Sequence, residues 1–333
     1  MRFLPALHIS DFDATALPDG DKAKGWLEVA TRPDGSAWQL PVLCVTGKSA
    51  GPTLLVLAGV HGNEYEGIEA IPRIFARTEP AELNGRLIMV SACNMPAYEV
   101  GVRNSPVDGH NLARVFPGDP DGTVSMRIAH WITEGFIKKA DFLIDLHSGG
   151  PESDLPTLIG YEHGSDEAGR SCLAAARAFG APVLWGHPPP VAPGRTCSAA
   201  SENGVPWLYT ETRGGGRATE DDLACYVEGV FNVMKYLDML PGKPRPRPLT
   251  HHLCGNGNLD EIITAAAAGI FRAQVDLLQE VERGDTIGTV NDLFGQSLET
   301  VTADRRGFVI LLRRTPTVSV GDSVACITGG PPD

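Results

Sequence analysis

The hydrophobic positions along the first 240 residues alternate between two spacings. Short, continuous apolar runs, such as TLLVLAGV at residues 53–60, are typical of strands buried on both faces of a sheet. Segments with apolar residues three or four positions apart predict helices between them. The predicted strands are residues 53–60, 86–92, 141–146 and 206–210, and the predicted helices are residues 64–77, 124–139, 166–179 and 220–240. This alternation predicts an α/β domain over residues 1–240, with a mainly parallel mixed sheet flanked by helices.

The pattern changes after residue 240. Residues 241–248 (PGKPRPRP) are rich in proline, which stops helices and interrupts central strands, so we interpret residues 241–252 as a linker. Residues 253–333 contain short strand-like runs separated by Gly-Asp and Asp-rich turns, which predict a smaller all-β barrel or sandwich. Its turns resemble the hammerhead domain that carries lipoyl or biotinyl groups. That carrier role needs a lysine, and the last lysine, Lys243, precedes the domain.

The composition narrows the classes of partner. The chain has 28 Lys and Arg against 41 Asp and Glu, a net charge of −13, so neither nucleic acid nor an anionic membrane is an expected partner. The seven cysteines are scattered without a CxxC pair, which favours reduced thiols over a disulfide framework. The N-terminal segment lacks the apolar run of a signal peptide. We therefore expect a cytoplasmic protein, and the sequence is compatible with either a monomer or a homo-oligomer.

The segment GVHGNEYEG, residues 59–67, carries the strongest chemical signal. His61 follows an apolar strand, Glu64 lies at the start of a predicted helix, and His147 ends another strand in DFLIDLHSGG. Ligands of α/β sheets bind beyond the carboxyl ends of the strands, where these side chains can meet. Two histidines and one glutamate form a catalytic zinc set with a fourth position open for water. HxxE alone is a weak motif, but the shared placement after apolar strands favours one zinc ion per chain.

Four ordered segments carry a resemblance to a known family. They are GVHGNEYEG (59–67), NMPAYEVGVRNSPVDGHNLARVFPG (94–118), DLHSGG (145–150) and YTETRGGG (209–216). Over about residues 40–240 the chain resembles the succinylglutamate desuccinylase/aspartoacylase family, which is related to the zinc carboxypeptidases. The resemblance implies a zinc-carboxypeptidase-like fold and a hydrolase that removes a small acyl group from an N-acyl amino acid. The appended β-domain is similar to that of the longer bacterial members, some of which deacetylate N-acetylated diamino acids such as N-acetyl-2,4-diaminobutyrate.

The resemblance also implies roles for single residues. His61, Glu64 and His147 match the zinc ligands of the family. Glu211 matches the general base that activates the attacking water. Arg103 matches the arginine that polarises the scissile carbonyl.

The substrate-binding residues show one departure from the family. Arg114 matches part of the clamp for the substrate carboxylate, and Asn111 lies in the same loop. The usual Asn-Leu-Asn-Arg is Asn-Leu-Ala-Arg here, so Ala113 replaces the asparagine that would join the arginine. Arg195, in APGRTC, is a candidate to supply a replacement charge, although a surface arginine is an equally good interpretation.

Other polar residues receive simpler interpretations. Asp145 lies two residues before His147, on the same face of the strand, and is a candidate partner that orients this ligand. The remaining histidines have no partner at ligand spacing and are interpreted as surface or core residues: His110, His130, His163, His187, His251 and His252.

Two further functions compete with the deacylase. A metallocarboxypeptidase that acts on short peptides would use the same metal set, but the β-domain is expected to narrow the cleft and favour a small substrate. A metal-binding protein without catalysis would need neither Glu211 nor Arg103.

Overall fold

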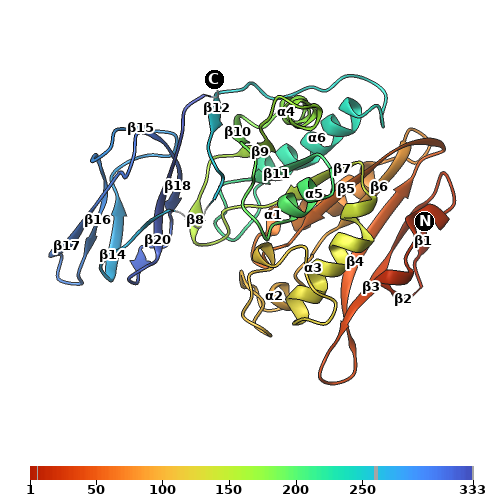
Figure 1. Ribbon diagram of the computed structural model, residues 1–333, viewed down its shortest axis with the longest axis horizontal. Coiled ribbons are helices and arrows are strands. Elements are labelled where there is room, and N and C mark those ends of the chain that lie inside the picture. Colours follow the sequence, from red (N-terminus) through yellow and green to blue (C-terminus); the bar gives the residue numbers. More distant parts are fainter. Residues whose placement is uncertain (6, 259–261, 332–333) are drawn as a thin grey trace.

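The structure is a computed structural model that describes residues 1–5, 7–258 and 262–331. A large mixed sheet occupies the centre of the first part of the chain (Figure 1). Its strands are β1 (Arg2–Phe3), β2 (Leu7–His8), β3 (Lys22–Thr31), β4 (Ala37–Thr46), β5 (Ser49–Ala58), β6 (Asn84–Val90), β7 (Phe142–Leu146), β9 (Leu158–Glu162), β10 (Val183–His187), β11 (Trp207–Glu211) and β12 (His251–Cys254).

The strand order is β1-β3-β4-β6-β5-β7-β11-β9-β10-β12, and β2 pairs with β3. The strands β6, β5, β7 and β11 at the centre run parallel, whereas β4 pairs antiparallel with β3 and β6, and β9 pairs antiparallel with β11. The helices are α1 (Tyr65–Arg77), α2 (Met95–Tyr98), α3 (Val124–Gly135), α4 (Glu167–Phe179), α5 (Thr196–Glu202) and α6 (Glu220–Tyr236), with short 3-10 helices η1 (Ile9–Asp11), η2 (Ala14–Ala16), η3 (Leu112–Arg114) and η4 (Ile137–Lys139).

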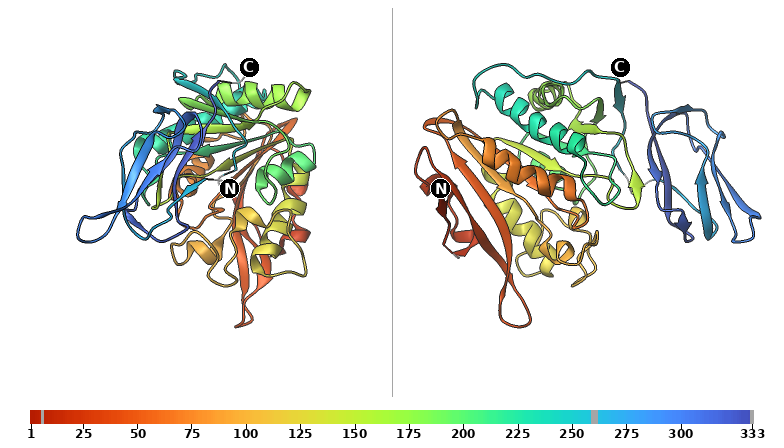
Figure 2. Two further views of the ribbon diagram at one scale, coloured as in Figure 1. Left: turned by 60° about the vertical axis from the view of Figure 1, so that its left-hand side comes forward. Right: turned by 180° about the vertical axis from the view of Figure 1, so that it is seen from behind.

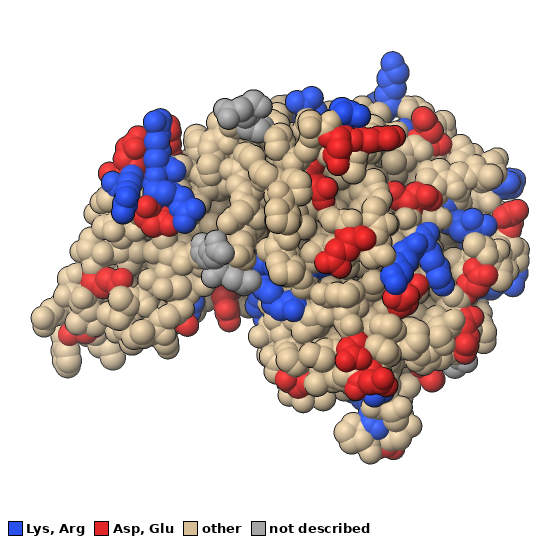
Figure 3. Space-filling view, viewed as in Figure 1, with Lys and Arg blue, Asp and Glu red and all other residues tan. Residues whose placement is uncertain are grey.

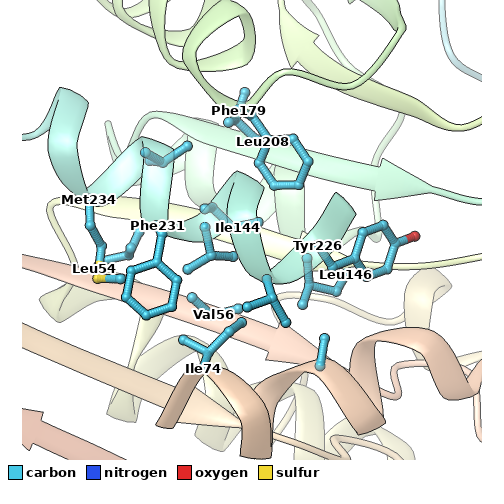
Figure 4. Packing of buried hydrophobic residues seen from close by; sticks show 14 of the residues in the cluster. Leu54, Val56, Ile74, Ile144, Leu146, Phe179, Leu208, Tyr226, Phe231 and Met234 are labelled. Atoms are coloured by element: carbon cyan, nitrogen blue, oxygen red, sulfur yellow. The ribbon is translucent and has the colours of Figure 1, made fainter. Parts of the chain in front are cut away.

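Helices cover both faces of the sheet, which explains the continuous apolar runs. Leu54 and Val56 of β5 belong to a core with α1, α4 and α6, whereas the alternate residues Leu55 and Leu57 belong to a second core with α3 and α5. Figure 2 shows α1 and α6 side by side on one face, where the two helices pack together. In Figure 4, Ile144 of β7 lies with Leu54 and Val56 among side chains of these helices.

The expected fold class is confirmed, and the differences in the elements have local causes. Each predicted strand and helix of the first part is present. The helix expected over residues 124–139 ends at Gly135 and is followed by η4, because the chain leaves the α-helical conformation at Phe136. The long hairpin of β3 and β4 was not predicted, although β3 alternates in burial and β4 contains the apolar run LPVLCV at residues 40–45, both of which are typical of strands.

The C-terminal part consists of two antiparallel sheets. Their strands are β13 (Ile263–Thr264), β14 (Gly269–Ala273), β15 (Glu280–Val281), β16 (Thr286–Asn291), β17 (Ser297–Thr302), β18 (Gly307–Arg313), β19 (Thr317–Val318) and β20 (Ser323–Thr328). One sheet has the order β13-β20-β18-β15 and the other β17-β16-β14-β19. β12 of the large sheet contains His251 and His252, which were predicted to lie in the linker, and Leu253 and Cys254, which were predicted to begin the β-domain.

One short strand joins the two parts of the chain. β8 (Ser153–Asp154) follows the His147 segment and pairs antiparallel with β18, with Asp154 opposite Leu312. The backbone N–H of Arg314 donates to Glu152 O at 2.8 Å beside this pairing. Figure 1 shows β8 between the large sheet and the C-terminal sheets. The all-β part is therefore hydrogen-bonded to a loop that begins at the carboxyl edge of the large sheet.

Acidic and basic side chains are interspersed on the face shown in Figure 3. Two exposed ion pairs join α1 to α6, Arg73 to Glu220 at 2.8 Å and Arg77 to Glu228 at 2.6 Å. Exposed pairs of this kind contribute little stability, so the packing between these helices depends on their apolar faces. Within the described part of the chain, no helix combines the length and the apolar character needed to cross a bilayer.

The core between β7 and the helices should dominate stability. Ile144 is fully buried, so Ile144→Ala removes its packing in the core with α1, α4 and α6 and should lower the free energy of unfolding by roughly 2–5 kcal/mol. Leu293→Ala is the matched control, because this side chain is 86% exposed and its loss should change stability by less than about 0.5 kcal/mol. Denaturant unfolding followed by circular dichroism measures both, and equal effects would contradict the assigned core.

Candidate active site

The three predicted metal ligands meet at the carboxyl edge of the large sheet. His61 follows β5, Glu64 precedes α1, and His147 follows β7. β5 and β7 are parallel neighbours, with Ala58 opposite Leu146, so both strands end at the same edge. One ligand atom from each of the three side chains lies within 4.8 Å of the others.

The Glu64 carboxylate lies between the two imidazole rings. Glu64 Oε1 is 2.7 Å from His61 Nδ1, and Oε2 is 3.0 Å from His147 Nδ1. Glu64 occupies the N-cap position of α1, yet its side chain makes no capping hydrogen bond to the helix. Ser148 N donates to Oε2 at 3.2 Å, so backbone from the His147 segment also holds this carboxylate.

The opposite ring nitrogens have partners that fix the orientation of each ring. His61 Nε2 lies 3.0 Å from Asn111 Oδ1, which also accepts from Ala113 N at 2.9 Å. His147 Nε2 lies 2.9 Å from Asp145 Oδ2, the partner that the strand spacing suggested. Both partners are acceptors, so each Nε2 carries the hydrogen and each Nδ1 is turned towards Glu64.

These contacts test whether a cation fits the site. Burial, and then the charge of Arg103, lower the pKa of His61 to about 4, so the ring is neutral at pH 7 and Nδ1 carries a lone pair. His61 Nδ1 makes no hydrogen bond among the described residues, although a carboxylate oxygen lies 2.7 Å away. The lone pairs of His61 Nδ1 and of the Glu64 oxygen repel each other at this distance. A cation bound between them would attract both. The donor set of two imidazoles and one carboxylate suits zinc.

Glu211 ends β11 beside this donor set. β11 pairs in parallel with β7, with Thr210 opposite Leu146, which brings Glu211 to the same edge. The side chain is buried, and its Oε2 has no hydrogen-bond partner within the described structure. Burial, and next the charge of Glu64, raise the pKa of Glu211 to about 8. The carboxyl group can therefore take up and release a proton near neutral pH.

Three arginines predicted from the sequence line the same cleft. Arg103 Nη1 donates to Glu64 Oε1 at 2.7 Å, which places its guanidinium beside the donor set. Arg114 Nη1 donates to Ala113 O at 2.9 Å. Arg195 donates to Pro193 O at 2.9 Å and to Asn258 Oδ1 at 3.0 Å.

The cleft has two halves that share Arg103, Arg114 and Glu211. One half is lined mainly by the first part of the chain and is largely apolar: His61, Ala113, His147, His187, Val191, Ala192, Arg195, Thr196, Cys197, Trp207, Tyr209, Asn256 and Gly257. The other half extends to the C-terminal sheets, whose Leu311, Arg313 and Asp322 contribute to its wall together with Asn63, Asn111 and Ser148.

The comparison with known proteins identifies the family. Residues 50–237 match the family model of the succinylglutamate desuccinylase/aspartoacylase catalytic domain. The chain is also 32% identical over 322 residues, 95% of its length and 93% of the relative, to the N-alpha-acetyl-L-2,4-diaminobutyric acid deacetylase of Halomonas elongata. The chain belongs to the succinylglutamate desuccinylase/aspartoacylase family. This family consists of hydrolases that act on amides, and the chain is an enzyme of that class.

Solved structures of the same family share nearly the whole fold. The succinylglutamate desuccinylase/aspartoacylase from Rhodobacter sphaeroides has a TM-score of 0.86 and 31% identity, over 97% of this chain and 98% of the other. The product-bound ectoine utilization protein EutE (DoeB) from Ruegeria pomeroyi has a TM-score of 0.85 and 31% identity, over 94% of this chain and 98% of the other. The similarity therefore includes the C-terminal sheets, and the resemblance inferred from the four segments is confirmed.

The structure adds residues that the sequence did not single out. His187 ends β10 and lines the cleft, although the sequence suggested a surface or core histidine. Tyr209 and Thr196 line the same half of the cleft. The position of His187 after the apolar run VLW matches that of His147 after FLIDL, so the end of β10 was the available signal. The other five histidines of that group line neither half of the cleft.

The donor set should bind about one zinc ion per chain. His147→Ala removes a ligand and should abolish tight binding, whereas Asp145→Asn should weaken zinc affinity by about 10- to 100-fold because the partner that orients the ring of His147 loses its negative charge. Metal analysis after equilibrium dialysis measures both effects. His130→Ala, on α3 away from the site, is the control. Full zinc occupancy in His147→Ala would contradict the assigned ligand set.

The raised pKa of Glu211 makes the stability of the metal-free protein depend on pH. The unfolded chain loses the Glu211 proton near the usual glutamate pKa of 4.5, whereas the folded chain, with a pKa of about 8, retains it to about pH 8. The folded state then binds more protons in this window, so this group lowers stability as pH rises, by up to about 3 kcal/mol between pH 5 and pH 7.5. The glutamine of Glu211→Gln cannot titrate, so the free energy of unfolding of this variant should fall less as pH rises through this window. Denaturant unfolding of both chelated proteins across the window measures the difference, and parallel curves would exclude the assigned pKa.

Proposed function

We propose that the protein is a zinc-dependent deacylase that removes a small acyl group from an N-acyl amino acid. The observation that carries this proposal is the convergence of two imidazole Nδ1 atoms, the Glu64 carboxylate and the buried Glu211 carboxyl group on one cleft. The seven scattered cysteines support a location in the reducing cytoplasm.

The proposed metal would be held by His61, Glu64 and His147. When bound, zinc lowers the pKa of water to about 7 and polarises a carbonyl group, which is the chemistry that amide hydrolysis needs. Glu211 then takes the proton of the attacking water and later delivers it to the leaving amine. Its raised pKa suits both steps, and a cation beside it would move that pKa back towards the usual range.

The arginines supply the remaining charges. Arg103 is positioned to donate to the oxygen that becomes negative during attack, since its guanidinium already donates to Glu64 Oε1 next to the donor set. Arg114, which lines both halves of the cleft, is the proposed partner of the substrate carboxylate. With Ala113 in place of the usual asparagine, the carboxylate has one donor fewer at this position.

The shape of the cleft favours a small substrate over a peptide. Leu311 and Arg313 of β18 line the second half of the cleft, and Arg314 beside them is hydrogen-bonded to the loop that follows His147. An extended peptide would have to pass the C-terminal sheets on this side. A carboxypeptidase therefore fits the cleft less well than a deacylase.

The relative from Halomonas elongata suggests the first compounds to test. The zinc-loaded protein should hydrolyse N-acetyl amino acids, including N-acetyl-L-2,4-diaminobutyrate, faster than dipeptides of similar size. Release of the free amine measures both reactions. Faster hydrolysis of dipeptides would favour the carboxypeptidase, and no hydrolysis of any acyl amino acid, across acetyl, succinyl and formyl groups, would contradict the proposal.

Removing the base should separate metal binding from catalysis. Glu211→Gln keeps the size of the side chain but cannot accept the proton of water, so kcat should fall by at least about 10²–10⁴-fold with zinc content unchanged. Glu202→Gln, at an exposed position of α5, is the control that should retain full activity. Unchanged turnover in Glu211→Gln would remove this residue from the mechanism.

A further inference from the structure

The apolar half of the cleft has a polar wall that the proposed mechanism does not use. His187 ends β10, Tyr209 lies two residues before Glu211 on β11, and Thr196 begins α5. All three side chains line the cleft together with Trp207. The direction of each hydrogen bond in this wall determines which chemical groups it can bind.

His187 is held in one tautomer. Its Nδ1 lies 2.9 Å from Gly255 O, and a carbonyl oxygen only accepts, so Nδ1 carries the hydrogen. The ring is 3% exposed, and its burial lowers the pKa of His187 to about 4. The ring is therefore neutral at pH 7, and Nε2 is an acceptor without a hydrogen.

Tyr209 consequently gives its only hydroxyl hydrogen to His187. The Tyr209 oxygen lies 2.8 Å from His187 Nε2, and the two rings are stacked with their centroids 5.5 Å apart. Two glycines make room for this pair. A Cβ atom on Gly160 would lie 1.9 Å from the Tyr209 ring, and one on Gly257 would lie 2.6 Å from His187 Nδ1. Any bond that Tyr209 makes to a ligand through its hydroxyl oxygen is therefore one in which Tyr209 accepts.

The neighbouring polar groups also donate their hydrogens to acceptors within the protein. The Thr196 hydroxyl donates to Asp145 Oδ2, the carboxylate that orients His147. The indole N–H of Trp207 donates to Ser201 Oγ at 2.8 Å. All four side chains thus direct their hydrogens to protein acceptors: Tyr209, His187, Thr196 and Trp207. The hydroxyl groups of Tyr209 and Thr196 can therefore offer a ligand only their oxygen lone pairs. Asn256 adds an amide that can accept as well as donate.

One arginine, Arg195, also lines the apolar half, where it donates to Pro193 O and to Asn258 Oδ1. The other two arginines and the acceptor wall lie on different sides of the cleft. Arg103 and Arg114 lie on the side shared with the second half, where they can bind a carboxylate. We infer that Tyr209, with its hydrogen directed to His187, is a specificity-determining residue that selects substrates whose amino-acid side chain ends in an N–H donor, such as an amine. This inference rests on the proposed deacylase function. A side chain with only acceptors would face the lone pairs of Tyr209 and Thr196, and an apolar one would leave them without partners.

Three acetylated amino acids test this selection in the zinc-loaded full-length protein. N-acetyl-L-2,4-diaminobutyrate ends in an amine, N-acetyl-L-norvaline replaces that amine by a methyl group of similar size, and N-acetyl-L-aspartate ends in acceptors only. The wild-type protein should prefer the first over each of the others by roughly 10- to 100-fold in kcat/KM. Tyr209→Phe should lower this ratio by about tenfold or more, through slower turnover of the diaminobutyrate compound with little change for norvaline.

Tyr161→Phe is the matched control. Tyr161 lies on β9, and its hydroxyl also bonds to a histidine, His252 Nε2 at 2.7 Å, but it lines neither half of the cleft. This variant should keep the wild-type ratio. His187→Phe is a second test, because it releases the Tyr209 hydrogen to the cleft. In that variant the preference for the amine should fall and the rate with aspartate should rise relative to norvaline.

The outcomes separate this inference from the proposed function. Hydrolysis of all three substrates without preference for the amine would overturn the inference and leave the deacylase intact. The same holds if Tyr209→Phe and His187→Phe, folded and loaded with zinc, both keep the wild-type ratio. If Tyr209→Phe does not fold, the inference is tested by the wild-type preference for the amine and by the ratio of kcat/KM values in His187→Phe. No hydrolysis of any acyl amino acid would instead remove the proposed function itself.

Discussion

The close approach of the buried Glu64 carboxylate to the Nδ1 atoms of two histidines is the constraint on which this site depends. Glu64 presents its oxygens to the Nδ1 atoms of His61 and His147 at 2.7 and 3.0 Å. Asn111 and Asp145 hold the opposite nitrogens, so the rings cannot turn away without losing those bonds. A divalent cation is the simplest group that would bind the Glu64 carboxylate and both ring nitrogens at once.

The large sheet holds these groups together at one edge. Apolar residues of β5 pack alternately into two cores, and β7 lies directly beside it, so the strand ends are held by packing on both faces. β11 brings Glu211 to the same edge and also places Tyr209 on the wall of the cleft. One strand thus links the proposed base to the proposed determinant of specificity. A change in the register of β11 would move both.

Asn111 illustrates how a loop can serve the metal ligands as well as the substrate. It was expected among the substrate-binding residues, and in the structure its Oδ1 is occupied by His61 Nε2 and Ala113 N. Ala113 lies in the same turn and leaves Arg114 as the charged group of that loop in the cleft. Arg195, another candidate for substrate binding, lines the cleft while two of its donors bond to the loops around it.

The sequence by itself determined the central strands and the main helices, because continuous apolar runs require strands covered on both faces, and it indicated the donor set of His61, Glu64 and His147, because these residues follow such runs. It also indicated Asp145, since residues two apart share a face of a strand. Only the tertiary structure decided the roles of His187, Tyr209 and Thr196. Their chemistry depends on which partner takes each hydrogen, and those partners, Gly255 O and Asp145, lie about 50 to 70 residues away in the chain. The pairing of β8 with β18 is equally long-range, and no local pattern specifies it.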